Sequence, residues 1–208
     1  MSVCTFFGHR DCPESVRPIV RAVLEILIEE QGVDLFYVGN QGRFDAIVHG
    51  TLQQLQQKYP HIQYAVVLAY MPGRKKEYED HFDTMLPEGI EAVHPHYALT
   101  WRNRWMLKQA DFVVTHITHH WGGAARFAES ARKQKKTVIN IDAQTFDALP
   151  PSVLERLLMN DAQEVACLSA EDCVAVFNCF CSQNPPAETT DAQASWEQFR
   201  TRNPEFFE

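Results

Sequence analysis

The sequence predicts an α/β protein with a Rossmann-like, doubly wound and mostly parallel sheet that carries helices on both faces. Short apolar runs typical of buried strands alternate with amphipathic helical patterns up to about Asp142. Helices that alternate with strands in this way are the connections that parallel strands require. Glycine-containing loops also follow three of the strands directly, and in open α/β sheets ligands bind at that edge.

The first unit is a strand over residues 3–7, a loop at Gly8-His9-Arg10, and a helix that Pro13 opens. The helix ends near Gly32, because glycine is the residue that most readily terminates a helix. Its apolar stripe has the spacing of one helix face and consists of Val16, Ile19, Val20, Val23, Leu24 and Leu27.

The same pattern repeats at once. A strand over 35–38 precedes a loop punctuated by Gly39 and Gly42 and ending at Asp45. The next helix has an apolar stripe of Val48, Leu52, Leu55 and Tyr59, and a third strand covers residues 64–68. Between Tyr70 and Ala98 the pattern weakens: the charged residues 74–80 are expected on a solvated face, and residues 90–93 suggest one more short strand.

The stretch from Trp101 to Asp142 contains the clearest signal for a ligand site. It predicts a helix with Arg102 and Asn103, a strand over 111–115, a loop ending in Trp121-Gly122-Gly123, a helix from about Ala124, and a strand over 137–141. A glycine pair lets the backbone approach a ligand closely, and the following helix N-terminus presents unpaired N–H groups with a partial positive charge. An anion is therefore the expected occupant.

Three loops should converge on one edge of the sheet, because Gly8, Gly39 with Gly42, and Gly122 with Gly123 all follow predicted strands. With the strand order 3-2-1-4-5, the first and fourth strands are neighbours and their loops flank a crevice. Arg10 suits a bidentate phosphate contact, and Asp45 suits ribose hydroxyls. Neither GxGxxG nor GxxxxGK[ST] is present, which argues against a standard dinucleotide fold and a P-loop kinase.

Composition limits the possible partners and locations. A net charge of −8 and a pI near 5.6 disfavour nucleic acid or an anionic membrane as partner. No apolar run approaches the ~18 residues that span a bilayer, and no secretory signal is recognisable, so a cytoplasmic protein without a membrane partner is expected. The six cysteines fit a reducing compartment better than a disulfide framework.

We expect one nucleotide-binding domain with additions at its end. The Rossmann-like domain should cover residues 1–145, and a helical extension over 146–182 should pack on the sheet or on a partner subunit. Residues 183–208 are polar and contain prolines, so they are expected to form a flexible tail.

Several of these segments also carry a resemblance to a known family. They occur in this order and spacing within residues 2–142: Cys4-Thr5-Phe6-Phe7-Gly8-His9-Arg10, Gly39-Asn40-Gln41-Gly42-Arg43-Phe44-Asp45, Arg102-Asn103 and Gly122-Gly123. They look like the SLOG superfamily, specifically its YoqJ-like bacterial branch. The superfamily groups Rossmann-like domains that bind nucleotides or nucleotide-derived ligands. It includes the Lonely Guy phosphoribohydrolases and the DNA-processing protein Smf.

The resemblance implies a phosphate site at Gly8 to Arg10 and at Gly122-Gly123, with Arg102 and Asn103 lining it. The enzymatic branch has a PGGxGTxxE motif, whose Glu acts with an upstream Arg in cleaving an N-glycosidic bond. Here Glu129 and Arg102 resemble that pair, but Trp121, Ala125 and Arg126 replace the motif's Pro, third Gly and Thr. Glu129 is also placed to form an ordinary i, i+4 ion pair with Lys133 on an exposed helix face.

Three functions follow from these observations. The first is a binding protein or sensor for a nucleotide or nucleotide-derived phosphorylated ligand. The second is a phosphoribohydrolase acting on a nucleoside 5′-monophosphate through Arg102 and Glu129, which the incomplete motif disfavours. The third is single-stranded DNA binding, which the acidic balance disfavours. The resemblance to dimeric Lonely Guy proteins and the extra helices after Asp142 suggest a homodimer.

No metal or other cofactor is expected. Histidines cluster near the glycine loops, but their spacing and the lack of accompanying carboxylates do not define a metal site. These histidines are His94, His96, His116, His119 and His120. Cysteines near the end of the chain lack the paired CxxC spacing of structural zinc and are better explained as small buried hydrophobic residues. They are Cys167, Cys173, Cys179 and Cys181.

Overall fold

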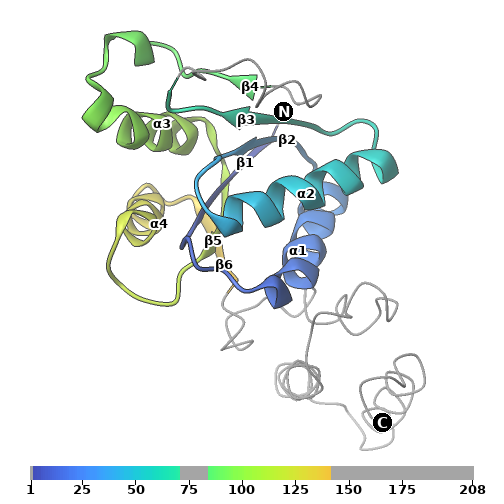
Figure 1. Cartoon of the computed structure of the whole chain (residues 1–208). Helices are drawn as coiled ribbons and strands as arrows, with labels where there is room; N and C mark the ends of the chain where they lie inside the picture. The colour runs from blue at the N-terminus through green and yellow to red at the C-terminus, as the bar shows by residue number, and fades with distance from the viewer. Residues whose placement is uncertain (1, 71–83, 142–208) are drawn as a thin grey trace, which may run out of the picture. The chain divides into compact units, whose positions relative to one another are not determined.

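A computed structural model describes residues 2–70 and 84–141, and these residues form an α/β fold around a parallel sheet (Figure 1). Within them the sheet has six strands, in the order β4-β3-β2-β1-β5-β6. The strands are β1 (Ser2–Gly8), β2 (Val33–Val38), β3 (Gln63–Val67), β4 (Thr84–Met85), β5 (Phe112–His116) and β6 (Thr137–Asn140). The predicted fold class is confirmed. Five of the six segments expected as strands form strands, in the order that was assumed for the crevice, and β4 adds a short strand outside β3.

The position of β1 between β2 and β5 explains why its sequence is apolar on both faces. It pairs in parallel with β2 through Thr5 and Tyr37, and with β5 through Gly8 and His116. Cys4, Phe6 and Phe7 are all buried, as expected of a strand that helices cover on both sides. Because β1 and β5 end together, the loops that follow them start side by side.

Three helices of the sheet unit place the loops around this edge. They are α2 (Arg43–Lys58), α3 (Pro95–Gln109) and α4 (Gly123–Lys133) (Figure 1). Phe7 packs with α3 and α4 in a cluster that includes Leu107 and Ala131. On the opposite face, Phe44 of α2 lies against Gly8. Successive side chains of a strand point to opposite faces, so α2 covers one face and α3 with α4 the other.

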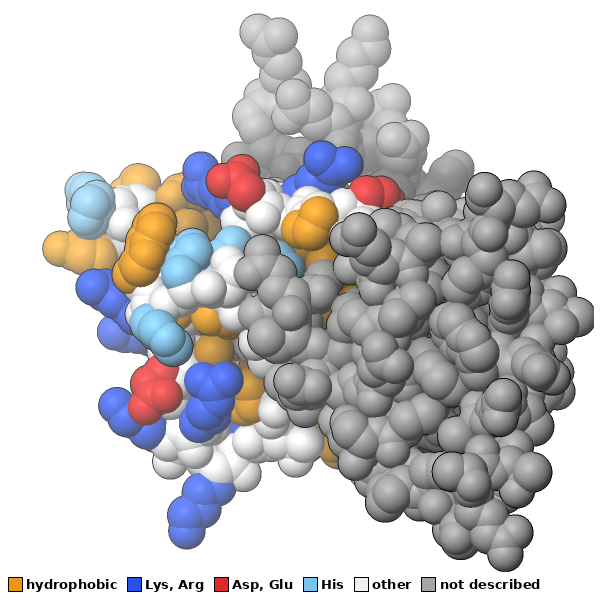
Figure 2. All heavy atoms as spheres, turned by 90° about the horizontal axis from the view of Figure 1, so that it is seen from below, with side chains coloured by type: hydrophobic (Ala, Val, Ile, Leu, Met, Phe, Trp, Pro, Cys, Tyr) orange, Lys and Arg blue, Asp and Glu red, His pale blue; other side chains and the backbone are white. Residues whose placement is uncertain are grey.

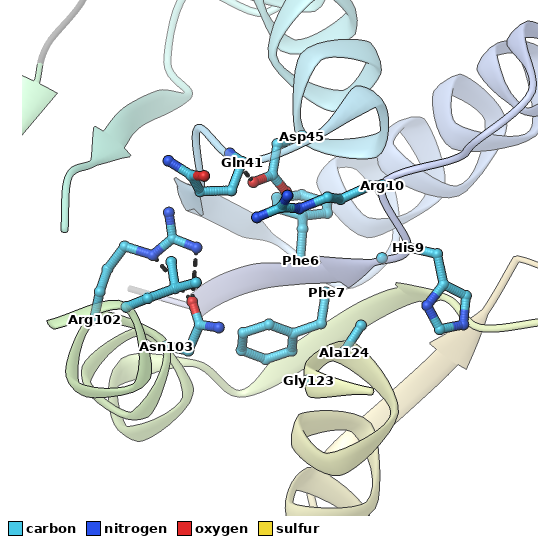
Figure 3. Close-up of a pocket in the computed structure, with 12 residues that line it drawn as sticks. Phe6, Phe7, His9, Arg10, Gln41, Asp45, Arg102, Asn103, Gly123 and Ala124 are labelled. Atoms are coloured by element: carbon cyan, nitrogen blue, oxygen red, sulfur yellow. Dashed lines mark hydrogen bonds between the residues drawn. The ribbon is translucent and has the colours of Figure 1, made fainter. Parts of the chain in front are cut away.

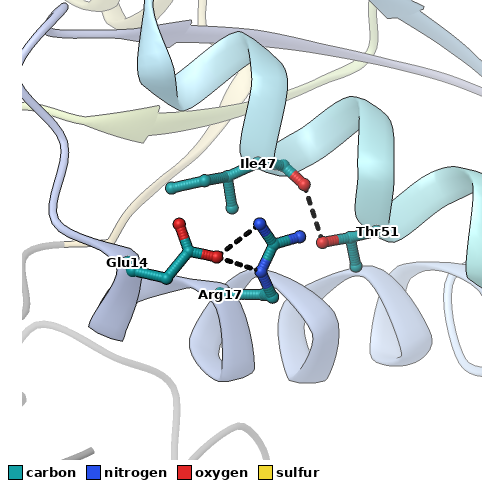
Figure 4. A network of polar contacts seen from close by, with 4 residues as sticks. All are labelled: Glu14, Arg17, Ile47 and Thr51. Atoms are coloured by element: carbon teal, nitrogen blue, oxygen red, sulfur yellow. Dashed lines mark hydrogen bonds and ion pairs between the residues drawn. The ribbon is translucent and has the colours of Figure 1, made fainter. Parts of the chain in front are cut away.

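Residues 13–26 belong to a second compact unit, and residues 2–12 and 27–140 belong to the unit that contains the sheet. They comprise η1 (Glu14–Val16) and most of α1 (Arg17–Glu29), whose predicted apolar stripe is buried. Glu14 and Arg17 form an ion pair at the start of the helix (Figure 4). In α2 of the sheet unit, the Thr51 hydroxyl donates to the Ile47 carbonyl at 2.8 Å, which satisfies a buried hydroxyl within its own helix (Figure 4).

The structure corrects one element and leaves others outside its range. Residues 90–93 are not a strand: Ile90–Ala92 is a 3-10 helix (η3) that follows Gly89, whose φ of 79° turns the chain. The charged residues 74–80 lie outside the described residues. The same holds for the helical extension and tail expected over 146–208, and for the end of the domain expected at residue 145.

We predict that Gly8→Ala destabilises the fold by about 1–3 kcal/mol, the usual cost of overpacking. A Cβ at Gly8 would lie 2.2 to 2.7 Å from atoms of the Phe44 side chain, so that buried ring must shift. Gly123→Ala is the matched control, because a Cβ there meets no atom within 4 Å. Urea unfolding of both variants measures the difference; equal stability of the two would contradict the packing between β1 and α2.

Candidate functional site

A cavity of about 250 Å³ opens at the carboxyl edge of the sheet (Figure 3). Eight of the residues expected at a ligand site line it: Gly8, His9, Arg10, Asp45, Arg102, Asn103, Gly123 and Ala124. Four further lining residues were not predicted as ligand contacts, although the first three lie in the segments that carry the family resemblance: Phe6, Phe7, Gln41 and Leu99. The cavity therefore joins the end of β1, the loop before α2, the middle of α3 and the start of α4.

Backbone hydrogen bonds hold the β1 loop between its neighbours. The amide of His9 donates to the carbonyl of His116 at 3.1 Å, which ties the loop to the end of β5. The amide of Arg43 donates to the carbonyl of Arg10 at 3.1 Å, which ties the same loop to the start of α2. These two contacts make the loop a fixed wall of the cavity.

Arg102 is a charged group buried beside the cavity. Only 4% of the residue is exposed. Its guanidinium donates to Asn103 Oδ1 at 3.0 and 2.7 Å (Figure 3) and to Asn40 Oδ1 at 3.1 Å. Burial lowers its pKa, although the charge of nearby Asp45 opposes that effect. The charge of Asp45 acts on the guanidinium, but no ion pair joins Arg102 to a carboxylate among the residues that the structure describes, so N–H donors remain that can bind an anionic ligand.

Asp45 is the buried carboxylate of the site, with 8% of the residue exposed. It accepts a hydrogen bond from the amide of Gln41 at 2.8 Å (Figure 3). Burial raises its pKa to about 6, while the Gln41 hydrogen bond and the Arg102 charge act in the opposite direction. A Cβ on Gly39 would lie 2.3 Å from Asp45 Oδ2, so the glycine makes room for this carboxylate and does not itself line the cavity.

The start of α4 is an open helix N-terminus. Its N-cap is Gly122, whose φ of 99° favours glycine, and no side chain caps the helix. The first turn contains no acidic residue, and nothing lies within 4 Å of where a Cβ on Gly123 would stand. No side chain therefore caps the first N–H groups of the helix, which is the arrangement that anion sites at helix N-termini use. Gly122 lies next to the cavity without lining it.

Gly42 is the N-cap of α2 and also lies outside the lining. Its φ is 109°, and a Cβ there would stand 3.0 Å from Arg10 Cα, so it allows the two loops to touch. Gly42 therefore has a structural role: it allows the loop that carries Arg10 to lie against the start of α2, with Arg10 at the rim of the cavity.

Glu129 lies apart from the lining residues. It is exposed on α4, with its carboxylate 3.6 Å from Lys133 Nζ and 3.9 Å from Arg132. The structure therefore forms the ordinary i, i+4 pair that the sequence allowed. It does not bring Glu129 and Arg102 together in the cavity.

Two histidines form a stack with a tryptophan beside the site. The rings of His9 and His119 lie 3.6 Å apart between centroids, and those of His119 and Trp121 lie 3.8 Å apart. Burial lowers the pKa of His9 and the charge of the adjacent His119 lowers it further, while a backbone hydrogen bond with His119 acts in the opposite direction. Sequence proximity of His119 and Trp121 hinted at this cluster, but the participation of His9 depends on the fold.

Within residues 2–70 and 84–141, no group of three or more histidine, cysteine, aspartate or glutamate side chains is arranged to hold a metal ion. His94 instead caps α3, accepting from the amide of His96 at 3.2 Å. In the same part of the chain, no helix is long and apolar enough to cross a membrane.

The comparisons with known proteins show a likeness in fold. The sequence matches no protein-family model and no curated protein. The structure is similar to the X-ray structure of DNA processing protein A (DprA) from Streptococcus pneumoniae, with a TM-score of 0.53 and 16% sequence identity. The likeness covers 80% of this chain and 61% of that chain, so this chain spans about three fifths of the neighbour.

We predict that Asp45→Asn stabilises the protein above pH 6 and has little effect near pH 4. In the folded protein the pKa of Asp45 is about 6, above the ordinary value of 3.8, so the folded state holds the proton more tightly than the unfolded state does. This protonation stabilises the fold fully below pH 3.8, and the stabilisation is lost as the pH rises through about 6. Asparagine avoids that loss, which is of the order of 3 kcal/mol at pH 8. Urea unfolding at pH 4, 6 and 8 measures it; a difference between the two proteins that does not change with pH would refute it.

Proposed function

We propose that the protein binds a nucleotide, or a nucleotide-derived phosphorylated ligand, in this cavity and acts as a binding protein or sensor. The observation that carries the proposal is that the buried Arg102 and an uncapped helix N-terminus lie at the same cavity. Arg102 donates hydrogen bonds to asparagine amides, and it forms no ion pair with a carboxylate among the residues that the structure describes. Both features favour an anion, and both become more effective where water is excluded.

The arrangement suits the parts of a nucleotide in a definite order. A phosphate fits the first N–H groups of α4, with Arg10 at the rim and the backbone of Gly8 and His9 opposite. Asp45, mostly ionised at pH 7, would accept hydrogen bonds from ribose hydroxyls. A volume of about 250 Å³ is just under the ~300 Å³ of small ligand pockets, so phosphate and ribose fit inside and the base lies at the rim.

Single-stranded DNA is the weaker alternative. The structural neighbour is, by its name, a DNA processing protein, and a strand presents the same phosphates and sugars as a free nucleotide. The net charge of −8 argues against it, because binding to a strand depends on basic surface that releases counterions.

We predict that Gly123→Val abolishes nucleotide binding and leaves the fold intact. The valine side chain would enter open space in the free protein and occupy the place of the phosphate in the complex. Arg10→Ala should weaken binding about 10-fold through loss of one charge-assisted hydrogen bond. Arg132→Ala, on the exposed face of the same helix as Gly123, is the control and should bind as wild type does. Calorimetry with AMP, CMP, GMP and UMP measures these affinities. An unchanged affinity in Gly123→Val would show that the phosphate does not bind at the start of α4.

A phosphoribohydrolase is the second candidate, and Asp45 is the observation that favours it. A carboxyl group buried in a cavity with a pKa near 6 is the kind of group that acts as a general acid or base at neutral pH. It lies in the cavity where Glu129 does not. In such an enzyme Asp45 would take the part that the family motif gives to its glutamate.

We predict that base release from nucleoside monophosphates is weak or absent, since the turn that fixes the phosphate departs from the enzymatic motif at Ala125 and Arg126. If release occurs, Asp45→Asn should abolish it and Glu129→Gln should not. Chromatography of free base after incubation with AMP, CMP, GMP and UMP measures it. Rapid release of base by wild type would favour the enzyme over the binding protein or sensor. Loss of that release in Glu129→Gln but not in Asp45→Asn would support Arg102 and Glu129 as the catalytic pair, as expected from the sequence.

A cytoplasmic homodimer is also part of the proposal. The resemblance to dimeric Lonely Guy proteins supports the dimer, as does the apolar character of the sequence after Asp142. The six cysteines support the location, because their arrangement fits a reducing compartment better than a disulfide framework.

A further inference from the structure

Trp121 is exposed but its ring is held in place. Of its surface 73% is accessible, more than that of any other large hydrophobic residue in the described parts of the chain. Its ring stacks on His119 with an interplanar angle of 17°, and His119 stacks on His9 at 21°. A contact of 3.0 Å between His119 Nδ1 and the Trp121 carbonyl also links the two residues. An ordered, exposed tryptophan is a common sign of a binding surface.

The stack connects the surface to the cavity. His9 lines the cavity, and Trp121 directly precedes Gly122, the N-cap of α4. Both faces of the His119 ring are covered by its neighbours, which leaves the outer face of Trp121 open. Histidine side chains and apolar side chains gather together on one face of the molecule (Figure 2). A ligand whose phosphate meets the first turn of α4 therefore binds next to the segment that carries this exposed ring, since Trp121 directly precedes the N-cap residue.

We propose that the outer face of Trp121 is the platform on which the base of the bound nucleotide stacks, and that it favours a purine. This inference rests on the proposed function and adds the part of the ligand that the cavity is too small to hold. Every nucleobase has a π-face, and stacking on an aromatic side chain contributes about 1–3 kcal/mol per base. A purine presents more ring surface to an indole than a pyrimidine does. The stack under Trp121 fixes the ring before binding, which reduces the entropy cost of forming the complex.

The test compares AMP with ribose 5-phosphate, which carries the same phosphate and sugar without a base. Wild type should bind AMP more tightly than UMP, and UMP more tightly than ribose 5-phosphate. Trp121→Ala should weaken AMP binding about 5- to 150-fold, which is the stacking contribution expressed as affinity, and leave ribose 5-phosphate unchanged. Trp121→Phe retains an aromatic face and should keep most of the affinity for AMP.

Tyr97→Ala is the matched control. Tyr97 is a second exposed aromatic residue, 61% accessible, on α3 and outside the cavity lining, so its loss should change neither affinity. A 5′-phosphorylated oligodeoxyadenosine is measured as a further ligand, to test whether the nucleotide is bound as part of a strand. Tighter binding of this strand than of AMP, with the same loss in Trp121→Ala, would support the platform and identify a strand as the source of the base.

Failure of the platform differs from failure of the site. If ribose 5-phosphate binds and Gly123→Val removes that binding, while AMP binds no tighter and Trp121→Ala has no effect, the base does not stack on Trp121 and the phosphate site remains. If wild type binds none of these ligands, both proposals are overturned. Calorimetry gives the affinities, and circular dichroism verifies that each variant is folded.

Discussion

The arrangement of the site depends on one electrostatic constraint, the burial of Arg102. A guanidinium taken out of water must be satisfied by hydrogen bonds and by negative charge. Asn40 and Asn103 supply hydrogen bonds, and Asp45 supplies a nearby charge without forming an ion pair. Burial likewise raises the pKa of Asp45. Two charges of opposite sign thus share a small cavity, each incompletely neutralised, and a ligand with an anionic group and hydroxyls would complete both sets of contacts.

Small residues let this charged pair lie at the edge of a tightly packed sheet. Gly39 makes room for the Asp45 carboxylate, and Gly8 makes room for the Phe44 ring that fixes the start of α2. Gly42 lets the loop after β1 touch the loop before α2. At α4 the glycines act differently, since the space around Gly123 is open. Gly8, Gly39 and Gly42 therefore allow close packing around the cavity, although of these three only Gly8 lines it, whereas Gly123 lines an open part of it.

The sequence was informative about residues that lie close to a strand end. Gly8 ends β1, His9 and Arg10 follow it directly, and Asp45 lies in the first turn of the helix after β2, so the rule for parallel sheets placed them at one edge and the structure brings them together. The prediction that Glu129 is catalytic rested on a motif position in a helix. Such a position does not reveal which face of the helix meets the cavity. Glu129 lies on the exposed face, next to Lys133. Gln41 offered no chemical signal: it contributes its backbone amide, which any residue other than proline would provide.

By itself, the sequence determined the class of fold and the approximate positions of five strands, and it predicted the edge of the sheet at which the structure has its cavity. Those follow from local periodicity and from rules of parallel connection that hold for any such chain. Only the tertiary structure decided that Arg102 is buried beside Asp45 and that His9 stacks on His119. Both contacts join residues far apart in the chain: their geometry depends on how helices and loops pack over the sheet. Burial and the pKa changes that follow from it are properties of that packing, and no sequence interval specifies them.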